Sequence, residues 1–582
     1  MSEKMKVKVD FCVVGGGLAG MCAALAASRR GAKVALMHDR PIPGGNASSE
    51  IRMWVCGARG KNMLETGIIE EILLENLYRN PGAVPALWDS VLYGILEYAP
   101  NLQLFLNCSC QSLKMKNSSA IKSVTGYQTT TQTFIEVEAD YFADCSGDSV
   151  LAPLSGAKFR HGREAKGEFN ESIEPEVADT HTMGNSCLFQ ARQLRKKVKF
   201  TPPVWARKFR SREDIPPYRG TLLEGLENFW WMETGGMGDT IKDTEANRRD
   251  LLEIAFGIWD YLKNYAPEKE KNAYWELDWV GFLPGKRENR RYEGDYIMNQ
   301  NDVDNAGQFD DLIAYGGWTM DDHHPAGFYH IGEPNKFHPA PSPFGIPYRA
   351  IYSCNVDNLF FAGRNISVSH AALSATRVMA TCAVLGQAAG TAAAMAIEKN
   401  ITPREVGVNF IKELQQNLME DDCYLPNFER TIPELSRNAE LIVSNNGNAD
   451  NLRNGCDRII GDSLNAWEAE SGDYAEYRFA KAEKISKIRL VLDSDLSRPE
   501  KNIVALRTLK QPDMKLPATL AKNFEISYQD SNGKWHLLEK VENNFRRLLV
   551  WDNLELEVKA VRFKLRRTWG NKKINIFSWD IA

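Results

Sequence analysis

Several signals that would narrow the function are missing from this chain of 582 residues. Its formal net charge is only −5, so nothing indicates a basic surface for nucleic acid or for an anionic membrane. The eleven cysteines show neither a C-x-x-C pair nor zinc-like spacing, which indicates reduced thiols in a cytoplasmic protein. The N-terminus lacks the apolar core and cleavage site of a secretory signal. We therefore expect a cytoplasmic protein without nucleic acid, membrane or metal.

Long hydrophobic runs are also scarce, and only one stretch needs a membrane check. Residues 378–397, VMATCAVLGQAAGTAAAMAI, are uncharged and long enough to cross a bilayer. They consist mainly of Ala, Gly and Thr and include Gln387, a composition that inserts weakly into lipid. A helix that is small and uncharged on all sides is typical of the interior of a globular domain. The sequence therefore predicts a buried helix here.

What the chain does have is a glycine-rich turn close to its beginning. Residues 7–37 predict a strand, a Gly-x-Gly-x-x-Gly turn, a helix and a second strand. Gly15 permits the tight turn, Gly17 lets the backbone approach a pyrophosphate, and Gly20 lets the helix pack closely on the strand. The helix N-terminus then directs free N–H groups at the phosphates. The expected elements are a strand at 7–14, a helix at 18–29 and a strand at 33–37. This arrangement predicts dinucleotide binding.

The residues after the second strand bear on the ribose and on the kind of dinucleotide. A ribose partner is expected about twenty residues beyond the glycines. The register places His38 there and Asp39 one step later, and either side chain can bond the ribose hydroxyls. A run of small residues then extends from Gly44 to Ser48. Such a loop can lie along the ribityl chain of a longer cofactor, so the sequence favours FAD over NAD.

Motifs spread along the chain resemble one family of flavoproteins. Four motifs occur in this order along the chain: GGNASSEIRM, RENRRYEGDY, GGWTMDDHHPAG and AGRNISVSHAALSATRVMAT. Between the first and second motifs, strands are expected from LQLFLNCSCQSL to the end of QTFIEVEADYFADCSGD. Together they resemble the bacterial FAD-dependent oxidoreductases that include xanthan-lyase-like proteins, with the FAD fold of glutathione reductase and, more distantly, fumarate reductase. The resemblance covers roughly residues 5–400. It implies an α/β, Rossmann-like FAD-binding domain with an inserted α+β cap domain that holds the substrate.

The glycine turn, the loop of small residues and the resemblance together place FAD on four segments of the chain. The expected cofactor-binding residues are Gly15, Gly17, Leu18, Ala19, Gly20, His38, Asp39, Arg40, Gly44, Gly45, Asn46, Ala47, Ser48, Arg52, Ser146, Gly147, Gly363, Arg364, Ala371 and Ala372. The last two begin an Ala-rich helix, whose N-terminal N–H groups are expected to stabilise negative charge on the reduced flavin ring.

The first candidates for catalysis lie on this Ala-rich helix. His370, Ser374 and Arg377 are spaced i, i+4 and i+7, which places them on one helical face. A histidine at that position has a pKa suited to accept a hydroxyl proton as hydride leaves for flavin N5. The other interpretation is that His370 caps the helix and that Arg377 pairs with a buried carboxylate.

The second candidate group is Asp321, Asp322, His323 and His324. Substrate hydrogen bonding or proton transfer is expected from His323 or His324. Neighbouring residues rarely all reach one ion, so we expect no metal there. The charged segment 287–291 either supports the site through salt bridges or, with Arg377, clamps a substrate carboxylate. Four tryptophans of the cap either stack on a sugar or pack internally: Trp230, Trp231, Trp275 and Trp279.

The composition changes after about residue 400 to short alternating strands, a pattern typical of a β-sandwich. The order of its strands and tryptophans resembles galactose-binding-like, discoidin-type jelly rolls. We expect this part to fold alone, to contribute no catalytic residue, and to serve packing or oligomerisation rather than glycan binding. The expected domains are 1–160 (FAD, first part), 161–340 (cap), 341–400 (FAD, second part), 401–440 (helical linker) and 441–582 (sandwich).

The sequence therefore predicts an FAD-dependent oxidoreductase. We expect hydride transfer between flavin N5 and a carbon of a small hydroxylated, sugar- or polyol-like substrate. Two alternatives stay open at this point. One is a fumarate-reductase-like enoate reductase, and the other is a carbohydrate-binding protein with a structural flavin. Homo-oligomerisation is left open as well.

Overall fold

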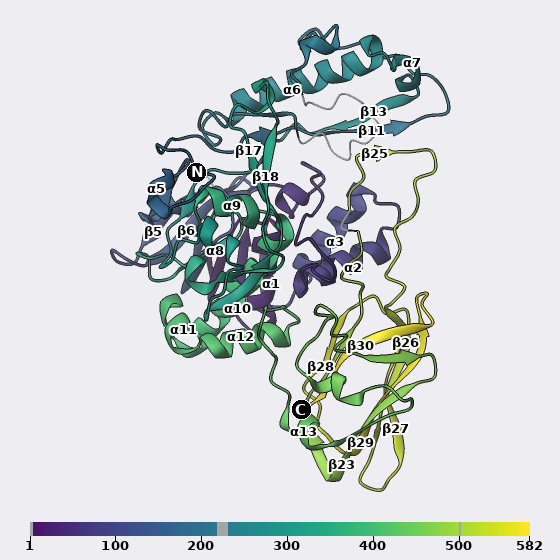
Figure 1. Ribbon diagram of the computed structural model, residues 1–582. Helices are drawn as coiled ribbons and strands as arrows, with labels where there is room; N and C mark the ends of the chain where they lie inside the picture. The colour runs from purple at the N-terminus through teal and green to yellow at the C-terminus, as the bar shows by residue number, and fades with distance from the viewer. Residues whose placement is uncertain (1–3, 218–230, 500–501) are drawn as a thin grey trace. The chain divides into compact units, whose positions relative to one another are not determined.

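The computed structural model describes residues 4–217, 231–499 and 502–582 (Figure 1). Trp230 therefore lies outside the described residues. By internal contacts the chain divides into two units. Unit 1 comprises Met1–Ala58, Gly82–Leu414 and Glu500–Asp513, and unit 2 comprises Arg59–Pro81, Gln415–Pro499 and Met514–Ala582.

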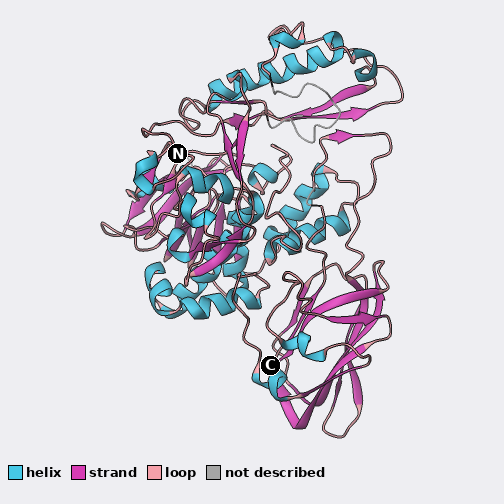
Figure 2. Ribbon diagram, viewed as in Figure 1, coloured by secondary structure: helices cyan, strands magenta, loops and turns pink. Residues whose placement is uncertain are grey.

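Unit 1 contains a five-stranded parallel sheet with the order β20-β8-β2-β3-β4. Figure 2 draws the strands of the protein in magenta and its helices in cyan. Its strands are β2 (Phe11–Val14), β3 (Val34–Met37), β4 (Leu102–Phe105), β8 (Tyr141–Asp144) and β20 (Leu359–Phe361). Every residue of four of these strands is buried, as expected for a parallel sheet covered on both faces. The predicted α/β, Rossmann-like class is confirmed.

The first strand of the chain differs from the prediction of one strand over 7–14. It divides into β1 (Lys4–Lys8) and β2, which belong to different sheets. The break falls at Asp10, whose carboxylate accepts a hydrogen bond from the Lys33 N–H at 2.7 Å. β1 instead joins a second sheet of order β1-β7-β6-β5. The other strands of that sheet are β5 (Cys108–Met115), β6 (Ile121–Gln128) and β7 (Thr133–Glu138).

The segment LQLFLNCSCQSL likewise forms two strands instead of the single strand predicted. β4 ends at Phe105 and β5 begins at Cys108, because Asn107 between them has a left-handed backbone with φ of 53°. Cys108 and Cys110 both lie on β5. No disulfide joins any of the eleven cysteines, all of which fall in the described part of the chain.

Two helices pack tightly against each other within unit 1: α1 (Leu18–Arg29) and α10 (Met379–Lys399). A β-carbon on Gly386 would lie 2.0 Å from the Ala19 carbonyl oxygen, and one on Gly390 would lie 2.1 Å from that of Ala23. Backbone therefore meets backbone along this contact, and no residue larger than glycine fits at either position.

Among the described residues, α10 is the helix long and apolar enough to cross a membrane by length and composition. However, 94% of its most apolar stretch is buried inside the protein. The predicted buried helix is confirmed. It begins at Met379, because Val378 has an extended backbone with ψ of 147° and separates α10 from the short helix α9 (His370–Thr376).

In its described residues the expected cap region contains short strands, short helices and the 17-residue helix α6 (Thr244–Asp260). Two small sheets have three strands each: β10 (Asn185–Ser186) with β12 (Glu233–Thr234) and β14 (Gly285–Lys286), and β11 (Phe189–Gln193) with β13 (Trp275–Val280) and β25 (Leu506–Arg507). Other strands form pairs: β16 (Leu312–Gly316) with β19 (Phe344–Pro347), β17 (Met320–His323) with β18 (Asn335–His338), and β9 (Phe159–Arg160) with β15 (Arg291–Tyr292). Trp231, only 4% exposed, packs in a core with Phe189 and Trp259, so this tryptophan is a packing residue.

Short helices complete the described elements of the chain. They are α2 (Ile68–Arg79), α3 (Pro85–Glu97), α4 (Leu151–Ser155), α5 (Lys166–Phe169), α7 (Lys269–Asn272), α8 (Gln300–Asp304), α11 (Pro403–Asn409), α12 (Ile411–Glu420) and α13 (Glu434–Asn438). The last three lie in the segment predicted to be a helical linker.

Unit 2 contains the predicted β-sandwich. Its antiparallel sheets have the orders β21-β23-β29-β26-β27 and β22-β30-β24-β28, and they share a core that includes Trp467, Phe563 and Trp579. The strands are β21 (Glu440–Val443), β22 (Trp467–Glu470), β23 (Tyr474–Ile485), β24 (Ile488–Leu492), β26 (Ala521–Gln529), β27 (Trp535–Val541), β28 (Leu548–Trp551), β29 (Leu556–Thr568) and β30 (Lys573–Ile581).

The division into units departs from the predicted boundaries at two places. Residues 59–81, expected in the FAD domain, belong to unit 2, where the buried Glu70 carboxylate accepts a hydrogen bond from the Arg498 guanidinium at 2.9 Å. Residues 502–513, expected in the sandwich, belong to unit 1 through the pairing of β25 with β11. By contacts, residues 502–513 are thus an exception to the expected sandwich, and the expectation that the sandwich folds alone stays a prediction.

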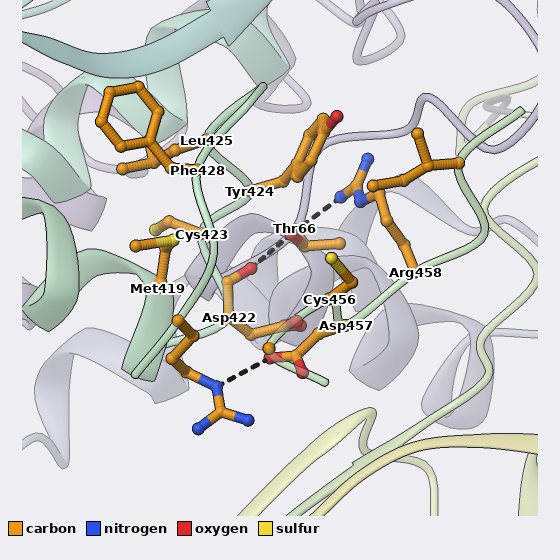
Figure 3. A pocket seen from close by; sticks show the side chains of 13 residues that line it. Thr66, Met419, Asp422, Cys423, Tyr424, Leu425, Phe428, Cys456, Asp457 and Arg458 are labelled. Carbon is orange, nitrogen blue, oxygen red and sulfur yellow. Dashed lines mark hydrogen bonds and ion pairs between the residues drawn. The ribbon is translucent and has the colours of Figure 1, made fainter. Parts of the chain in front are cut away.

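A small cavity of about 30 Å³ lies within unit 2 (Figure 3). Asp457 on its wall pairs with Arg489 at 2.7 Å and with Arg430 at 3.3 Å, and Arg458 stacks on the Tyr424 ring at 4.1 Å. This volume has room for about one water molecule. The cavity is thus part of a buried ion network that holds unit 2 together, and it is too small for a substrate.

Candidate functional site

The loop of small residues lies directly against the glycine turn, and residues 15–20 and 44–48 together are called the glycine cradle below. The Gly44 N–H donates to the Gly16 carbonyl at 2.7 Å. A β-carbon on Gly17 would find only the Gly45 Cα, at 3.9 Å. No side chain caps the N-terminus of α1, which begins at Leu18. The cradle therefore offers space beside Gly17 and uncapped N–H groups, the features that bind a pyrophosphate.

The other two glycines of the motif serve packing. A β-carbon on Gly15 would lie 2.4 Å from the Ser146 backbone nitrogen, and Gly15 has a φ of 106°. A β-carbon on Gly20 would lie 1.8 Å from the Gly15 carbonyl oxygen. Both positions exclude any side chain because backbone atoms fill the space. The roles predicted for the three glycines agree with these surroundings.

His38 shapes the glycine turn instead of facing outward. Its Nδ1 accepts a hydrogen bond from the Gly16 N–H at 3.0 Å, and its Nε2 lies 3.0 Å from the Ile42 carbonyl oxygen. Burial lowers the pKa of His38 to about 4, so the ring is neutral. Both ring nitrogens are used, so of the two residues predicted to bond the ribose only Asp39, whose side chain is 62% exposed, stays a candidate. Arg40 lies 3.6 Å from the Glu50 carboxylate.

Asp148 connects three of the predicted cofactor segments. Its two carboxylate oxygens accept from Arg364 at 2.8 Å and from Lys286 at 2.5 Å. The Asn46 side-chain amide donates to the Lys286 carbonyl at 3.0 Å. A β-carbon on Gly147 would lie 2.7 Å from the Arg364 guanidinium. The structure thus brings together residues that are more than 300 positions apart in the sequence.

Other predicted cofactor residues hold the cradle in shape. The Ser48 hydroxyl donates to the Gly45 carbonyl at 2.8 Å, and the Trp88 indole donates to the Ala47 carbonyl at 2.7 Å. The Ser146 hydroxyl donates to the Asp144 carboxylate at 2.6 Å. Gly363 has a φ of 117°, a left-handed conformation that a side chain rarely adopts. The contacts at Gly45 and Ala47 fix the conformation of the loop that is predicted to bind the cofactor.

Arg52 is held in a strained conformation beside this loop, with a φ of 59°. Its guanidinium lies 4.4 Å above the Trp279 ring and donates to the Gln190 side chain at 2.6 Å. Burial lowers the pKa of Arg52 to about 10, so it stays cationic at neutral pH. Trp279 therefore supports an arginine, which differs from the stacking role on a sugar considered for it.

Three consecutive residues connect the cradle to two of the three candidate histidines, His323 and His370. Lys286 pairs with Asp148 as described, and Arg287 lies 3.5 Å from the Glu233 carboxylate that contacts His323. Glu288 lies 2.9 Å from His370. The motif GKRENR thus places Lys286 beside the predicted cofactor segments. It places Arg287 and Glu288 among the buried charges that contact the two histidines. The charged segment is a support, as one of the two interpretations predicts.

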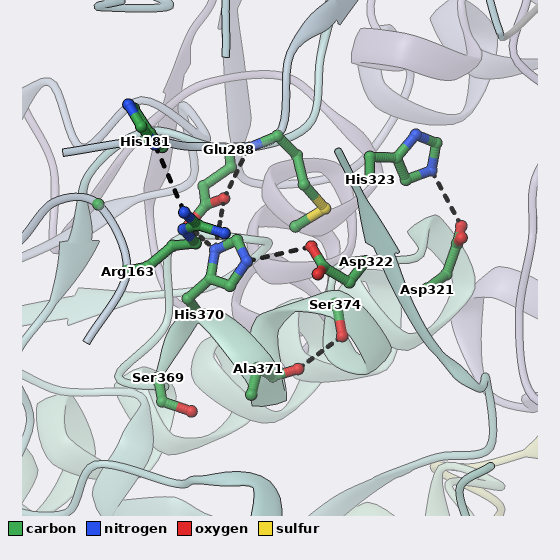
Figure 4. Close-up of polar contacts among 12 residues, drawn as sticks. Arg163, His181, Glu288, Asp321, Asp322, His323, Ser369, His370, Ala371 and Ser374 are labelled. Atoms are coloured by element: carbon green, nitrogen blue, oxygen red, sulfur yellow. Dashed lines mark hydrogen bonds and ion pairs between the residues drawn. The ribbon is translucent and has the colours of Figure 1, made fainter. Parts of the chain in front are cut away.

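His370 lies between two carboxylates (Figure 4). Its Nδ1 is 2.9 Å from Glu288, and its Nε2 is 3.2 Å from Asp322. Burial alone would lower the pKa of His370, but Glu288 and Asp322 outweigh it and raise the pKa well above its usual range. A ring that is already cationic cannot accept a hydroxyl proton. The predicted role of His370 as general base is therefore not supported.

His323 occupies a second chain of buried charges. Its Nδ1 is 2.7 Å from Glu233, and its Nε2 is 3.1 Å from Asp321, which also pairs with Arg377 at 3.1 Å. Burial would lower the pKa of His323, but Asp321 and Glu233 outweigh it and raise the pKa. Because side chains alternate along β17, Asp321 and His323 face one way and Asp322 faces His370. The two chains of charged residues are together called the histidine network below. One consists of Arg377, Asp321, His323, Glu233 and Arg287, and the other consists of Glu288, His370 and Asp322.

The N-terminus of α9 is closed by the protein itself. The His370 N–H donates to Glu164 at 2.9 Å, and the Ala372 N–H donates to the Ser369 hydroxyl at 3.2 Å. The helix has only seven residues and ends before Arg377, so the predicted continuous helical face is interrupted. The Ala372 N–H is thus already bonded to Ser369, which argues against its expected role in stabilising charge on the flavin, whereas the role expected for the Ala371 N–H stays a prediction.

His324, the other predicted candidate, makes different contacts from the network. Its ring stacks on His330 with centroids 3.6 Å apart, and its Nδ1 accepts from the Ala326 N–H at 3.2 Å. Burial lowers the pKa of His324, so the ring is neutral and its proton is on Nε2. In this tautomer Nε2 can donate a hydrogen bond, and the substrate role predicted for His324 stays a prediction.

The sequence reasoning missed the buried carboxylates that set these charges. Glu233 and Glu164 carry no motif of their own, and Glu288 was identified only as part of a charged segment. Glu174 was missed as well. Both of its carboxylate oxygens are buried without a hydrogen-bond partner in the described chain, and burial raises its pKa to about 7. A single acidic residue that belongs to no motif gives no signal in the sequence that it will be buried.

Three features define a dinucleotide-binding α/β protein whose loop suits a long cofactor. They are the parallel sheet, the glycine cradle and the glycine turn that follows β20. The family model for FAD dependent oxidoreductases matches residues 10–418, and the chain belongs to this family. It is thus an FAD-dependent enzyme. The cradle fits this cofactor, because the space at Gly17 and the uncapped start of α1 can take its pyrophosphate.

Two further comparisons cover smaller parts of the chain. A glycerol-3-phosphate dehydrogenase of Mycobacterium leprae is 41% identical over 66 residues, 11% of this chain and 11% of that protein, as is glycerol-3-phosphate dehydrogenase 2 of Mycobacterium tuberculosis. The chain thus spans about a tenth of the length of the curated relatives it matches.

Solved structures give only distant likenesses. A family 32 carbohydrate-binding module of Streptococcus pneumoniae EndoD is 14% identical, with a TM-score of 0.20, over 25% of this chain and 97% of that one. L-proline dehydrogenase from P.horikoshii is 20% identical, with a TM-score of 0.17, over 25% of this chain and 24% of that one. At such scores these likenesses carry no argument about this protein.

Proposed function

We propose that this enzyme oxidises a hydroxyl-bearing carbon of a small sugar- or polyol-like molecule. Bound FAD supplies the electron acceptor for this chemistry, since its N5 takes a hydride. The observation that carries the proposal is the chain Glu288–His370–Asp322, which runs from full burial to a carboxylate that is 20% exposed. The short likeness to glycerol-3-phosphate dehydrogenases favours a hydroxylated substrate as well.

In this proposal Asp322 accepts the hydrogen bond, and then the proton, of the substrate hydroxyl. Burial would raise the pKa of Asp322, but the hydrogen bond from His370 outweighs it and lowers the pKa. The carboxylate is therefore ionised at neutral pH. His370 holds it in place, and Glu288 fixes the other side of the ring. The proton then passes to water on the exposed side of Asp322.

The reductase alternative has less support, because it needs arginines that are available to clamp a substrate carboxylate. Arg291 is fully buried and lies 3.0 Å from Glu164. Arg377 donates to Asp321, and Arg290 donates to the Asp148 carbonyl at 3.4 Å. Each of these guanidinium groups already has a partner inside the protein.

The first prediction tests Asp322 directly. We expect Asp322→Asn to bind FAD normally and to slow anaerobic flavin reduction about 10²- to 10⁴-fold, the usual loss when a proton acceptor is removed. Flavin bleaching by stopped-flow, across sugars, polyols, hydroxy acids and their phosphates, is the measurement. Asp140→Asn, which changes an exposed carboxylate, is the matched control and should keep the parent rate.

Two outcomes contradict the proposal. If no hydroxylated compound bleaches the yellow parent enzyme, the substrate class is wrong. If Asp322→Asn is reduced at the parent rate by a working substrate, the proton acceptor lies elsewhere.

A further inference from the structure

A short segment from the C-terminal part of the chain is built into unit 1. Residues 502–509, called the strap below, lie between β24 and β26 in the sequence but belong to unit 1 by their contacts. Within the strap, β25 pairs in parallel with β11, and the Ala191 N–H donates to the Ala505 carbonyl at 3.1 Å (Figure 1). Arg507 also donates to the Ala83 carbonyl.

The beginning of the strap holds the loop that follows Arg52. The side-chain carbonyl of Asn502 accepts a hydrogen bond from the Val55 N–H at 2.9 Å, and Asn502 is only 4% exposed. A buried side chain that bonds a loop backbone restricts the conformations open to that loop. Val55 lies three residues after Arg52, so the restriction applies to the strained stretch of backbone.

The middle of the strap supports the strand that holds the Arg52 guanidinium. β11 lies between β25 and β13 in a three-stranded sheet. Gln190 of β11 accepts from Arg52 at 2.6 Å and pairs in the sheet with Trp279 of β13, whose ring lies under the guanidinium. Leu506 of the strap packs against the core formed around Trp259. Without β25, β11 would be an edge strand.

We propose that the strap is a positioning element for Arg52. Asn502 fixes the backbone on one side of this arginine, and β25 fixes the strand that binds its guanidinium. The strap itself provides no reacting group. Its effect reaches the cofactor through Arg52, which borders the glycine cradle in the sequence and bonds to the Ser49 carbonyl at 3.1 Å. The inference rests on the family assignment and on the cofactor role predicted for Arg52, and it holds for any substrate.

Two full-length variants test the inference in the holoprotein. One replaces residues 502–509 by a Gly–Ser linker of the same length, and the other is Asn502→Ala. We expect hydrogen exchange in residues 50–58 to become at least about tenfold faster in both variants. In residues 189–193 we expect faster exchange only in the linker variant. We expect FAD binding, measured by flavin fluorescence, to weaken about tenfold. Leu509→Ser changes a half-exposed side chain of the same segment and should leave both readouts unchanged.

A double-mutant cycle then asks whether the strap acts through Arg52. If it does, Arg52→Gln weakens FAD binding in the parent, and adding Asn502→Ala to it has little further effect. Independent, additive losses would overturn the inference, as would unchanged exchange at residues 50–58 in Asn502→Ala. These readouts need no substrate. A failure of the proposed hydroxyl oxidation appears instead as absence of flavin bleaching, with the exchange pattern unaffected.

Discussion

The glycine cradle and the histidine network are maintained by different forces. The cradle depends on the absence of side chains, since backbone atoms approach within contact distance at Gly15 and Gly20. The network depends on buried charges of opposite sign, such as His370 between Glu288 and Asp322. A substitution that adds a side-chain carbon should therefore disrupt the cradle. A substitution or pH change that alters a charge should disrupt the network.

The largest effect is expected inside the cradle itself. Gly20→Val places a β-carbon 1.8 Å from the Gly15 carbonyl oxygen, so we expect no folded protein. Gly17→Val has its nearest neighbour at 3.9 Å, so we expect a folded protein that has lost FAD, because the side chain occupies the pyrophosphate space. Circular dichroism and the flavin absorbance of purified protein separate the two. A Gly17→Val variant that is folded and fully yellow would show that the cofactor lies elsewhere.

A smaller loss of stability is expected when the network loses one charge. Glu288→Gln leaves His370 with one carboxylate fewer and removes a charge that is completely buried. Breaking one partner of a buried pair costs about 3 to 5 kcal/mol of unfolding free energy. Denaturant unfolding measures this loss. Glu245→Gln, which breaks the exposed pair with Arg248, is the control and should cost at most about 0.5 kcal/mol. Equal losses in the two variants would show that the buried charge of Glu288 does not maintain the network.

The two regions should also respond differently to pH. The folded pKa of His38 is lowered to about 4 from an ordinary 6.5, so its stabilisation is present above pH 6.5 and is lost as pH falls toward 4. The folded pKa of His370 is raised, so its contribution is present below pH 6.5 and is lost only as pH rises through the raised value. The pKa values of Glu288 and Asp322 are lowered, so their contributions persist in mild acid.

Between pH 6.5 and 4.5 we therefore expect FAD release before global unfolding, with roughly 2 kcal/mol of stability lost through His38. Flavin fluorescence reports release, and tryptophan fluorescence reports unfolding. His38→Asn keeps a side-chain acceptor for the Gly16 N–H but cannot titrate, so its FAD binding should be flat over this range. Acid release that is unchanged in this variant would assign the effect to another group.

The same comparison explains which parts were predictable from the sequence. The cradle is encoded within about thirty residues, so α1 and the need for glycine at Gly15 and Gly20 follow from spacing alone, while the pyrophosphate role of Gly17 stays a prediction. The sandwich was predictable because turn residues separate short alternating strands. The division of the first strand at Asp10 was not, since it depends on a hydrogen bond to Lys33 in the next strand.

The network could not be derived in this way. His370 and Asp322 were selected by residue type, but their charge state depends on Glu288, and no local pattern shows that these three side chains meet. The membership of residues 502–513 in unit 1 was missed for the same reason, because two paired residues in β25 give no recognisable strand signal. Local sequence identifies chemistry that uses backbone, whereas side-chain partners depend on the tertiary fold.

The glycine contact between α1 and α10 also bears on when the protein can acquire its cofactor during synthesis. α1 ends at Arg29, but the helix that covers it begins at Met379. A ribosome adds about 5 to 20 residues per second, so roughly 20 to 70 seconds separate the two helices at emergence. During that interval the apolar surface of α1 has no native cover from α10. We therefore expect FAD to enter after translation of α10, and nascent chains to depend on chaperones until then.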